Sequence, residues 1–378
     1  MVDWNGLFKW SMKYQDDSKD KSQFKKMDEE TKKWIQEAME SYTYNEAKRM
    51  KEICAELEKD EDGGEEDGER RLGLLEELQE LCEGIENARD LHLIGGLKIL
   101  IDLIFNTKYI ENKLIALQIF CSCNQNNTSI QYASIQYGAF KLINVVLDEK
   151  YSIKEKEHAF SALQAMLRGE HLEGKRQFID AEGIEFVAKV LNDTKSEKII
   201  YKAFSLLRDF VLYDERLHLT INNTELHANT NATTKKFHTE EQKELEKIQN
   251  NELPQNEHFK GIVKEKLKKL EIIEKYLESI LEDTSVKYTE KRAAFAEILK
   301  AMIIKYEDIK KFSTKHFDQI KKHIIKLEEL NKNEENCNDY EIEKWKEFLL
   351  AYITNQTQEN SQTTQSNQNN KPEKMLRL

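Results

Sequence analysis

The chain has 378 residues, of which 70 are acidic and 58 are basic, and its formal net charge at pH 7 is -12. A protein that binds nucleic acid needs a basic stripe to displace the counterions around phosphates, so this balance argues against nucleic acid as a partner. Only two prolines occur, Pro254 and Pro372, and their rarity permits long helices because proline disrupts helix interiors. No segment approaches the ~20 apolar residues of a membrane helix, so we expect no membrane contact.

Three segments precede the regular part of the chain. Residues 1–27 mix a short apolar and aromatic patch with charged residues, and they predict a flexible N-terminal segment. Residues 28–58 carry apolar side chains at helical spacing and predict one amphipathic helix. Residues 59–70 are acidic and interrupted by glycine, so they predict a solvated linker that buries nothing. The alternative is that this acidic segment contacts a basic partner.

The start of the chain and its cysteines indicate the compartment. The first ten residues carry charge and lack the apolar core of a secretory signal. The five cysteines have no C-x-x-C spacing, and we expect buried free thiols rather than disulfides or metal ligands. We therefore expect a cytoplasmic protein, with the nucleus as the alternative.

Two landmarks recur after residue 70. A glycine precedes an apolar helix at Gly95, Gly138 and Gly183, at intervals of 43 and 45 residues. A period near 43, with two long helices and a shorter one, is typical of armadillo repeats. We expect each glycine to take a positive φ in the turn before the long helix, where a Cβ would be strained. An alanine followed by a bulky residue recurs at intervals of 43 and 44 residues, in the pairs Ala116-Leu117, Ala159-Phe160 and Ala203-Phe204.

The pattern changes in the second half of the chain. Residues 220–257 predict a polar insertion, after which helical periodicity resumes in a degenerate fourth unit. Two further helices are predicted at about residues 315–331 and 339–353, and the Gln/Asn-rich residues 355–378 predict a disordered tail. The predicted fold class is all-α, an armadillo-like right-handed superhelical solenoid over residues 71–354 with about four repeats flanked by capping helices.

Catalytic motifs are absent from the sequence. It contains no phosphate-binding loop, dinucleotide fingerprint, zinc-protease motif or nucleophile elbow. His316 and His323 lie seven residues apart on one predicted helix face, and we interpret them as surface histidines rather than metal ligands. We therefore expect no enzyme activity, no cofactor and no metal, and instead a monomer that binds another protein.

The concave side of the predicted solenoid is the expected binding surface. Armadillo units stack into a curved solenoid, and the last helix of each unit lines its concave side. Counted from the alanine landmark, we expect the positions two before it and two, six and nine after it to face the groove. The predicted partner-binding residues are Gln118, Ser122 and Gln125 in the first unit, Glu157, Ser161, Ala165 and Arg168 in the second, and Tyr201, Ser205 and Asp209 in the third.

The residue types at these positions distinguish between kinds of ligand. Armadillo carriers of nuclear-localisation peptides place Trp and Asn at the second and sixth positions after the landmark. Here the same positions hold Gln118 and Ser122 in the first unit, Ser161 and Ala165 in the second, and serine and aspartate in the third. This argues against an extended basic peptide as ligand and favours a folded lobe.

Four patches of sequence resemble one family. Residues 86–97, which read Glu-Asn-Ala-Arg-Asp-Leu-His-Leu-Ile-Gly-Gly-Leu, resemble a stretch of the armadillo-type nucleotide exchange factors of cytosolic 70-kDa heat-shock chaperones, the Hsp70-binding protein family. Residues 7–11, 125–127 and 162–169 resemble further patches of these proteins, in the same order. The resemblance covers roughly residues 1–215 and fades after them.

The resemblance implies a function without catalysis. The concave face would embrace one lobe of the ATPase domain of an Hsp70-class chaperone, and steric conflict with the opposite lobe would open the nucleotide cleft and release ADP. It also implies that Trp4, Leu7, Phe8 and Trp10 compete for the substrate site of the chaperone; the alternative is that this segment docks on its own solenoid. The alternative function is an armadillo adaptor or scaffold for a different protein partner.

Overall fold

The computed structural model describes residues 45–218, 257–282, 289–306, 309–333 and 339–369, together with the isolated residues 30, 33, 34 and 284. The regular elements of these residues are helices. The α-helices are α3 (Glu46–Leu57), α4 (Glu65–Leu81), α5 (Ile85–Leu93), α6 (Gly96–Asn106), α7 (Ile110–Asn124), α8 (Thr128–Gln136), α9 (Leu142–Leu147), α10 (Ile153–Leu167), α11 (Leu172–Asp180), α12 (Gly183–Asp193), α13 (Glu197–Tyr213), α15 (Ile262–Lys269), α16 (Ile272–Glu282), α17 (Thr289–Lys305), α18 (Ile309–Asn333) and α19 (Asp339–Asn369). Short 3₁₀ helices lie at Ala139–Lys141, Asp214–Arg216 and Glu257–Phe259.

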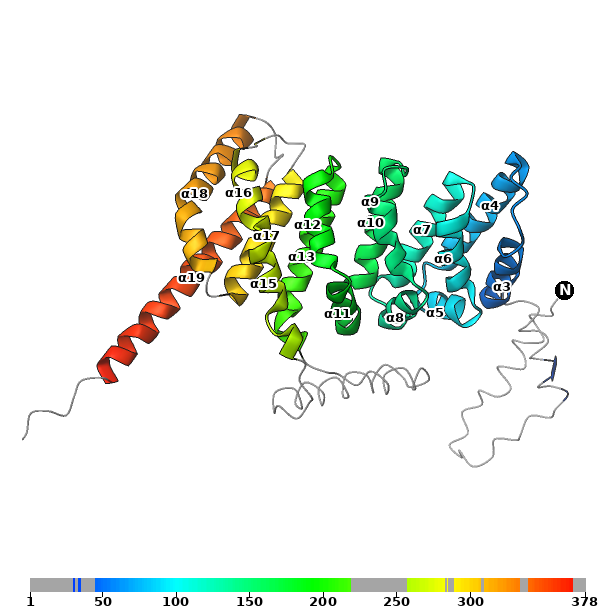
Figure 1. Ribbon diagram of the computed structural model, residues 1–378, viewed down its shortest axis with the longest axis horizontal. Helices are drawn as coiled ribbons and strands as arrows, with labels where there is room; N and C mark the ends of the chain where they lie inside the picture. Colours follow the sequence, from blue (N-terminus) through cyan, green and yellow to red (C-terminus); the bar gives the residue numbers. More distant parts are fainter. Residues whose placement is uncertain are drawn as a thin grey trace, which may run out of the picture.

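These helices repeat in sets of three along one axis (Figure 1). The sets are α5–α7, α8–α10, α11–α13 and α15–α17, each with a short first helix and a longer third helix. Helices α3 and α4 pack ahead of the first set, and α18 and α19 pack behind the last. The predicted solenoid of four repeats between capping helices is confirmed.

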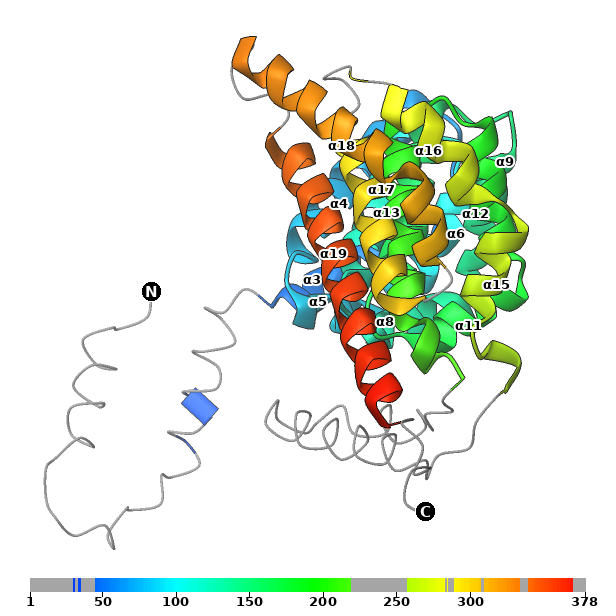
Figure 2. The ribbon, with the colours of Figure 1, turned by 90° about the vertical axis from the view of Figure 1, so that its left-hand side faces the viewer.

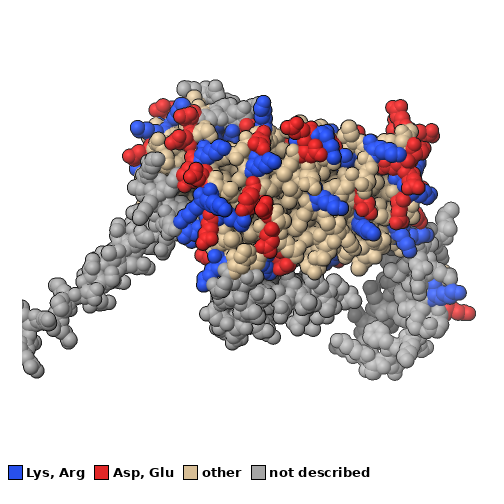
Figure 3. Space-filling view, viewed as in Figure 1, with Lys and Arg blue, Asp and Glu red and all other residues tan. Residues whose placement is uncertain are grey.

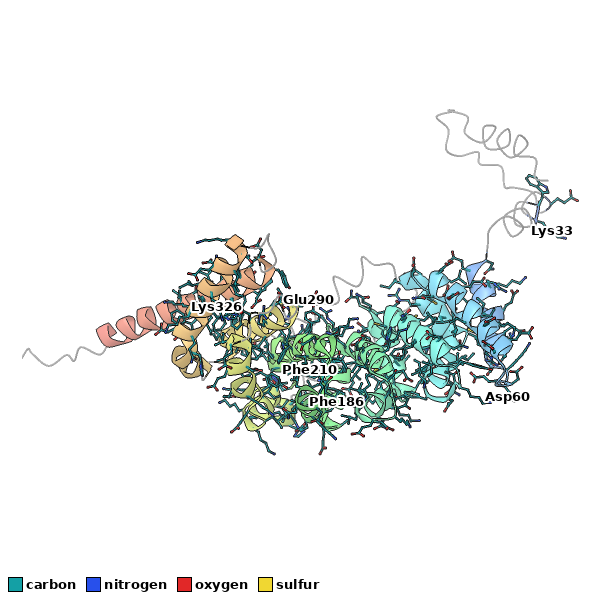
Figure 4. All side chains as sticks on the ribbon, turned by 90° about the horizontal axis from the view of Figure 1, so that it is seen from above. Lys33, Asp60, Phe186, Phe210, Glu290 and Lys326 are labelled. Carbon is teal, nitrogen blue, oxygen red and sulfur yellow. The ribbon has the colours of Figure 1, made fainter. Side chains whose placement is uncertain are left out.

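The third helices form one side of the stack. Helices α4, α7, α10, α13, α17 and α19 pack against one another in that order. Viewed along the stack, they lie opposite the second helices α6, α12 and α16 (Figure 2). Viewed from above, the stack is bowed: Glu290 at the start of α17 lies on its concave side, and Phe186 of α12 lies toward the convex side (Figure 4). The third helices therefore line the concave face.

A residue with positive φ precedes the second helix of every unit. Gly95 and Gly138 take this position in the first two units, with φ of 85° and 82°. In the third unit the residue is Glu182, with φ of 57°, and in the fourth it is Glu271, with φ of 51°. The prediction that Gly183 takes the positive φ was therefore wrong by one position, because glycine is the favoured residue there but is not required.

Gly183 is needed for a different reason. It is the first residue of α12, and a Cβ at this position would lie 2.3 Å from the ring of Phe178. Gly96, the first residue of α6, makes the same close approach, because its Cβ would lie 2.4 Å from Leu91. These two glycines allow the first and second helices of a unit to touch at their corner.

The last part of the amphipathic helix predicted over residues 28–58 is α3, and of residues 28–44 the structure describes only 30, 33 and 34. Helix α3 starts at Glu46, and the side chain of Asn45 caps it by accepting a hydrogen bond from the backbone N of Lys48 at 2.9 Å. Asparagine at this position favours a helix start over a helix interior because its side chain replaces a missing backbone acceptor. Residues 1–27 lie outside the described part of the chain.

The acidic segment 59–70 is not the solvated linker that its composition predicted. Its second half forms the first turn of α4, where carboxylates are stabilised by the positive end of the helix dipole. Glu61 accepts hydrogen bonds from the Thr107 hydroxyl at 2.6 Å and from the backbone N of Lys108 at 2.8 Å. Asp67 is buried and accepts one from Arg71 at 3.0 Å. Specific donors on α4 and on the loop before α7 therefore hold this segment on the solenoid.

The C-terminal tail also differs from its prediction. Helix α19 continues to Asn369, although residues 355–378 predicted disorder. No glycine or proline interrupts the chain between residues 354 and 371, so the sequence gives the helix no stop signal before Pro372. The predicted insertion at 220–257 lies almost entirely outside the described residues.

A buried ion-pair network attaches the last two helices. Glu341 of α19 accepts two hydrogen bonds from Arg292 of α17, at 2.8 and 2.7 Å, and one from the indole of Trp345 at 3.1 Å. His323 of α18 lies 3.2 Å from the same carboxylate. His316 is buried as well. The interpretation of His316 and His323 as surface histidines was therefore wrong, and His323 instead fastens α18 to α19.

Candidate protein-binding surface

Polar side chains connect neighbouring third helices along the first half of the concave face. Gln79 of α4 donates to Gln118 of α7 at 3.4 Å, and the amide nitrogen of Gln118 lies 3.1 Å from Nε2 of His158 on α10. Lys113 of α7 forms an ion pair with Glu155 of α10 at 3.2 Å. The side chains that point into the groove are thus fixed by their neighbours on the next helix.

The same arrangement continues from α10 to α13. Glu157 accepts a hydrogen bond from Ser196 at 2.6 Å and lies 3.6 Å from the ammonium of Lys198. The ammonium of Lys202 donates to the hydroxyl of Ser161, which in turn donates to the carbonyl of Glu157 at 2.7 Å. Burial lowers the pKa of Lys202, and the charge of Glu157 partly opposes that shift.

Asp209 forms an ion pair inside the solenoid. Its carboxylate lies 2.7 Å from the ammonium of Lys175, a fully buried side chain of α11. The same ammonium donates to the carbonyls of Leu167 and Gly169 at 2.5 and 2.6 Å, which satisfies the C-terminal end of α10. Burial lowers the pKa of Lys175 and Asp209 opposes it. Asp209 therefore neutralises a buried charge rather than offering a free one to a partner.

Most of the predicted partner-binding residues reach the surface. Ala165 does not: it is 7% exposed, and its carbonyl accepts a hydrogen bond from Gln131 of α8 at 2.9 Å. The prediction for this residue was wrong because the first helix of the unit covers its end of α10. The exposed members are Ser122, Gln125 and Arg168, and the half-buried members are Gln118, Glu157, Ser161, Tyr201, Ser205 and Asp209.

The sequence did not predict which residues of α17 and α19 line the second half of the concave face. Glu297 of α17 bridges the two helices beside it, since it pairs with Arg208 of α13 and lies 3.9 Å from Lys344 of α19. Glu347 of α19 pairs with Lys344 at 3.0 Å and with Lys300 of α17 at 2.8 Å. The insertion hid the repeat register here, although the Ala294-Phe295 pair repeats the earlier landmark.

Large apolar side chains follow these ion pairs. Leu212 of α13 is 39% exposed and Ile304 of α17 is 55% exposed. On α19, Leu350 is 66% exposed and Ile353 is 49% exposed. The convex side differs: uncharged side chains cover the middle of the stack there, and charged ones gather toward its ends (Figure 3). Leu212 occupies the ninth position after the Ala203 landmark, a position that the predicted register includes but that was not assigned in the third unit.

Among the described residues, this surface carries neither a metal-binding cluster nor a reactive thiol. The described residues hold no group of three or more His, Cys, Asp or Glu side chains placed to bind a metal ion. Cys54, Cys82, Cys121 and Cys123 are free thiols, and all but the half-buried Cys121 are buried. Burial raises the pKa of Cys54 to about 12 and also raises that of Cys121, so neither is a reactive thiolate at neutral pH. Cys337 lies outside the described residues.

These features define a class of protein: an armadillo-like helical solenoid whose concave face carries linked polar side chains and, toward α19, exposed apolar ones. Sequence comparison places the chain within that class. The SIL1/FES1/HPBP1 C-terminal domain matches residues 87–337, and the domain described as "Nucleotide exchange factor Fes1" matches residues 4–91. The chain belongs to the SIL1/FES1/HPBP1 family.

Several curated relatives are similar to part of the chain. "Hsp70-binding protein 1" of Homo sapiens is 26% identical over 189 residues, which are 48% of this chain and 52% of the relative. "Hsp70 nucleotide exchange factor FES1" of Saccharomyces cerevisiae is 28% identical over 150 residues, 39% of this chain and 51% of the relative. "Nucleotide exchange factor SIL1" of Rattus norvegicus is 23% identical over 144 residues, 38% of this chain and 30% of the relative. The chain spans about half the length of the first two relatives, and less of the third.

Solved structures support the fold. A designed armadillo repeat protein in complex with the peptide (KR)4 has a TM-score of 0.52 at 15% identity, over 80% of this chain and 99% of that one. A computationally designed armadillo repeat protein for modular peptide recognition has a TM-score of 0.51 at 15% identity, with the same coverage. Among the helices of the described residues, none is both long and apolar enough to cross a membrane.

Proposed function

We propose that this chain is a co-chaperone that binds the ATPase domain of an Hsp70-class chaperone through its concave face and promotes release of ADP. The observation that carries the proposal is the joint match of the exchange-factor domain at residues 4–91 and the family domain at residues 87–337. The names of three relatives describe Hsp70 binding or nucleotide exchange. The curved face from α4 to α19 supplies a surface on which a folded lobe can rest.

The proposed mechanism requires no covalent step by the chain itself. A concave face whose charges are held by internal pairs is preorganised, so little side-chain entropy is lost when a rigid lobe docks on it. Binding to the conformation with an open cleft shifts the chaperone toward that conformation and weakens its hold on ADP. By linkage, ADP weakens binding of the exchange factor by the same factor, which is roughly 5–150-fold for a typical coupling of ~1–3 kcal/mol.

The proposed partner residues are those that reach the concave surface. They include Arg168, Gln125 and Ser122 beside the ends of α7 and α10. We also propose that the N-terminal residues Trp4, Leu7, Phe8 and Trp10, which lie outside the described residues, compete for the substrate site of the chaperone. The chain acts as a monomer in the cytoplasm, where its free thiols remain reduced.

A pull-down with and without nucleotide tests this function. The tagged chain is mixed with a purified cytosolic Hsp70-class chaperone, once without nucleotide and once with excess ATP. The proposal predicts a stoichiometric complex without nucleotide that dissociates when ATP is added. A chain that retains no chaperone in the nucleotide-free state, while capturing another protein, would identify an adaptor for a different partner and overturn the proposal.

A further inference from the structure

The charged side chains on the last third of the concave face are already paired with one another. Arg208 pairs with Glu297, and Lys300 pairs with Glu347 at 2.8 Å. Lys344 lies between the two carboxylates, at 3.9 Å from Glu297 and 3.0 Å from Glu347. Pairs that are partly open to water contribute little net free energy, and a partner that buries them further must remove them from water. They orient the surface but provide few strong contacts.

Each of the three helices carries a large apolar side chain one turn beyond its paired residue. Leu212 follows Arg208 by four residues, Ile304 follows Lys300 by four, and Leu350 follows Glu347 by three. Residues three or four apart lie on the same face of a helix, so these side chains continue the face that the ion pairs define. All three are exposed.

Two ion pairs align the ends of these helices. Lys305 of α17 lies 2.6 Å from Glu215, just beyond the end of α13, which brings Ile304 within one turn of the level of Leu212. The pair between Lys300 and Glu347 places α17 and α19 in the register that brings Ile304 level with the turn of Leu350. The apolar side chains of Leu212, Ile304 and Leu350 therefore lie on one face across three helices, with paired charges on two sides of them. A contiguous exposed apolar patch with a polar rim is typical of a protein-binding site.

We infer that Leu212, Ile304 and Leu350 are the apolar anchor of the partner interface, and that they bind an apolar ridge on the folded ATPase lobe. The inference rests on the proposed function, because the patch is continuous with the concave face assigned to that lobe. Binding energy in protein interfaces concentrates in a few well-desolvated side chains enclosed by polar contacts that exclude water. The anchor thus lies in the C-terminal third, away from the serine and glutamine positions of the first units.

Charge substitutions in the patch test this inference. In the full chain, Ile304→Asp and Leu350→Asp are made singly and together. The matched controls are Leu93→Asp on α5 and Ile325→Asp on α18, where the parent side chains are 79% and 54% exposed. Circular dichroism and thermal unfolding establish that each variant keeps its helices, as expected for exposed positions. Affinity for the nucleotide-free chaperone is measured by calorimetry, and the dissociation rate is measured on a sensor surface.

The inference predicts that the double variant loses affinity by about 30-fold or more, mainly through faster dissociation, while the controls stay within about twofold of the parent chain. Ile304→Val, which keeps the apolar surface, should bind nearly as the parent does. A parent chain that binds and accelerates ADP release, beside a double variant that binds equally well, would overturn the inference and leave the proposed function intact. A parent chain that binds no chaperone would overturn both. A parent chain that sediments as a dimer, with a monomeric double variant, would assign the patch to a second copy and overturn the inference.

Discussion

The carboxylate of Asp214 accepts a hydrogen bond from the phenol of Tyr306 at 2.8 Å, although 92 residues of chain separate them. Asp214 follows α13 and Tyr306 follows α17, so this contact joins the ends of the third and fourth units. The same carboxylate also accepts from the backbone N of Val263 at 3.1 Å and of Lys264 at 3.3 Å, which caps α15. One buried side chain therefore fixes the fourth unit on the third, across the residues between 218 and 257.

This joint should be visible in a double-mutant cycle. Asp214→Ala leaves the backbone donors of α15 and the phenol of Tyr306 without their acceptor, whereas Tyr306→Phe removes one donor only. Because hydrogen bonds to a charged group contribute about 1.5–3 kcal/mol, we expect a coupling of about 1–3 kcal/mol between the two substitutions. Urea unfolding of the parent, both single variants and the double variant measures it. Strictly additive effects would show that the two side chains do not stabilise each other.

The turn before α12 provides a stabilising substitution. Glu182 holds φ of 57°, and its side chain is exposed. Since the left-handed conformation costs a residue with a Cβ about 1–2 kcal/mol, Glu182→Gly should raise the free energy of unfolding by about 1 kcal/mol. Gly183→Ala is the matched control and should destabilise, because its Cβ would meet the Phe178 ring at 2.3 Å. Chemical denaturation measures both effects. A destabilising Glu182→Gly or a stabilising Gly183→Ala would contradict this account of the turn.

The repeat period and its landmarks could be predicted from the sequence, but the position of the turn could not. The glycine that recurs before each apolar helix pointed to Gly183, whereas the positive φ belongs to Glu182. Residue type alone does not reveal which of two adjacent residues adopts the strained conformation. Composition also misled at the acidic segment, because it does not show that Arg71 and Tyr109 fold back on Asp67.

The candidate site was only partly predictable for the same reason. The repeat register correctly predicted that Ser122 and Arg168 are exposed, because positions three or four residues apart lie on the same face of a helix. The burial of Ala165 depends on Gln131 of a different helix, and the contribution of Glu297 depends on a unit whose register the insertion hid. Contacts between units arise from packing that a local pattern does not encode.

Lowering the pH should remove the contribution of Asp67 to the stability of the fold. Burial would raise the pKa of this carboxyl, but hydrogen bonds from Arg70, Arg71 and Tyr109 outweigh it and hold the pKa at about 2. Because the folded-state pKa lies below the ordinary value of 3.8, the stabilisation is present above 3.8 and is lost as the pH falls toward 2. Asp67→Asn should therefore lower the thermal midpoint at neutral pH, and its deficit should shrink across this window. A deficit that stays constant from pH 7 to pH 2 would refute the linkage.

The C-terminal cap depends on a buried ion pair. Both Arg292 and Glu341 are fully buried, and each loses its main partner if the other is truncated. Arg292→Ala should therefore destabilise by about 3–5 kcal/mol, because it leaves a buried carboxylate uncompensated. Replacing both by apolar residues, Arg292→Met with Glu341→Leu, should recover much of that loss. Urea unfolding measures both effects, and a single variant as stable as the double would mean that desolvation of the pair does not govern the cap.

The most direct test of the central claim is the rate at which a fluorescent ADP analogue leaves an Hsp70-class chaperone in the presence of this chain. The account predicts an acceleration of about tenfold or more at micromolar concentration of the chain. Arg168→Glu, on the concave surface, should reduce the acceleration several-fold, whereas Lys189→Glu, an exposed lysine of α12 on the opposite side, should not change it. An unchanged release rate with a competent chaperone would contradict the account, and equal effects of the two substitutions would show that the concave face is not the contact surface.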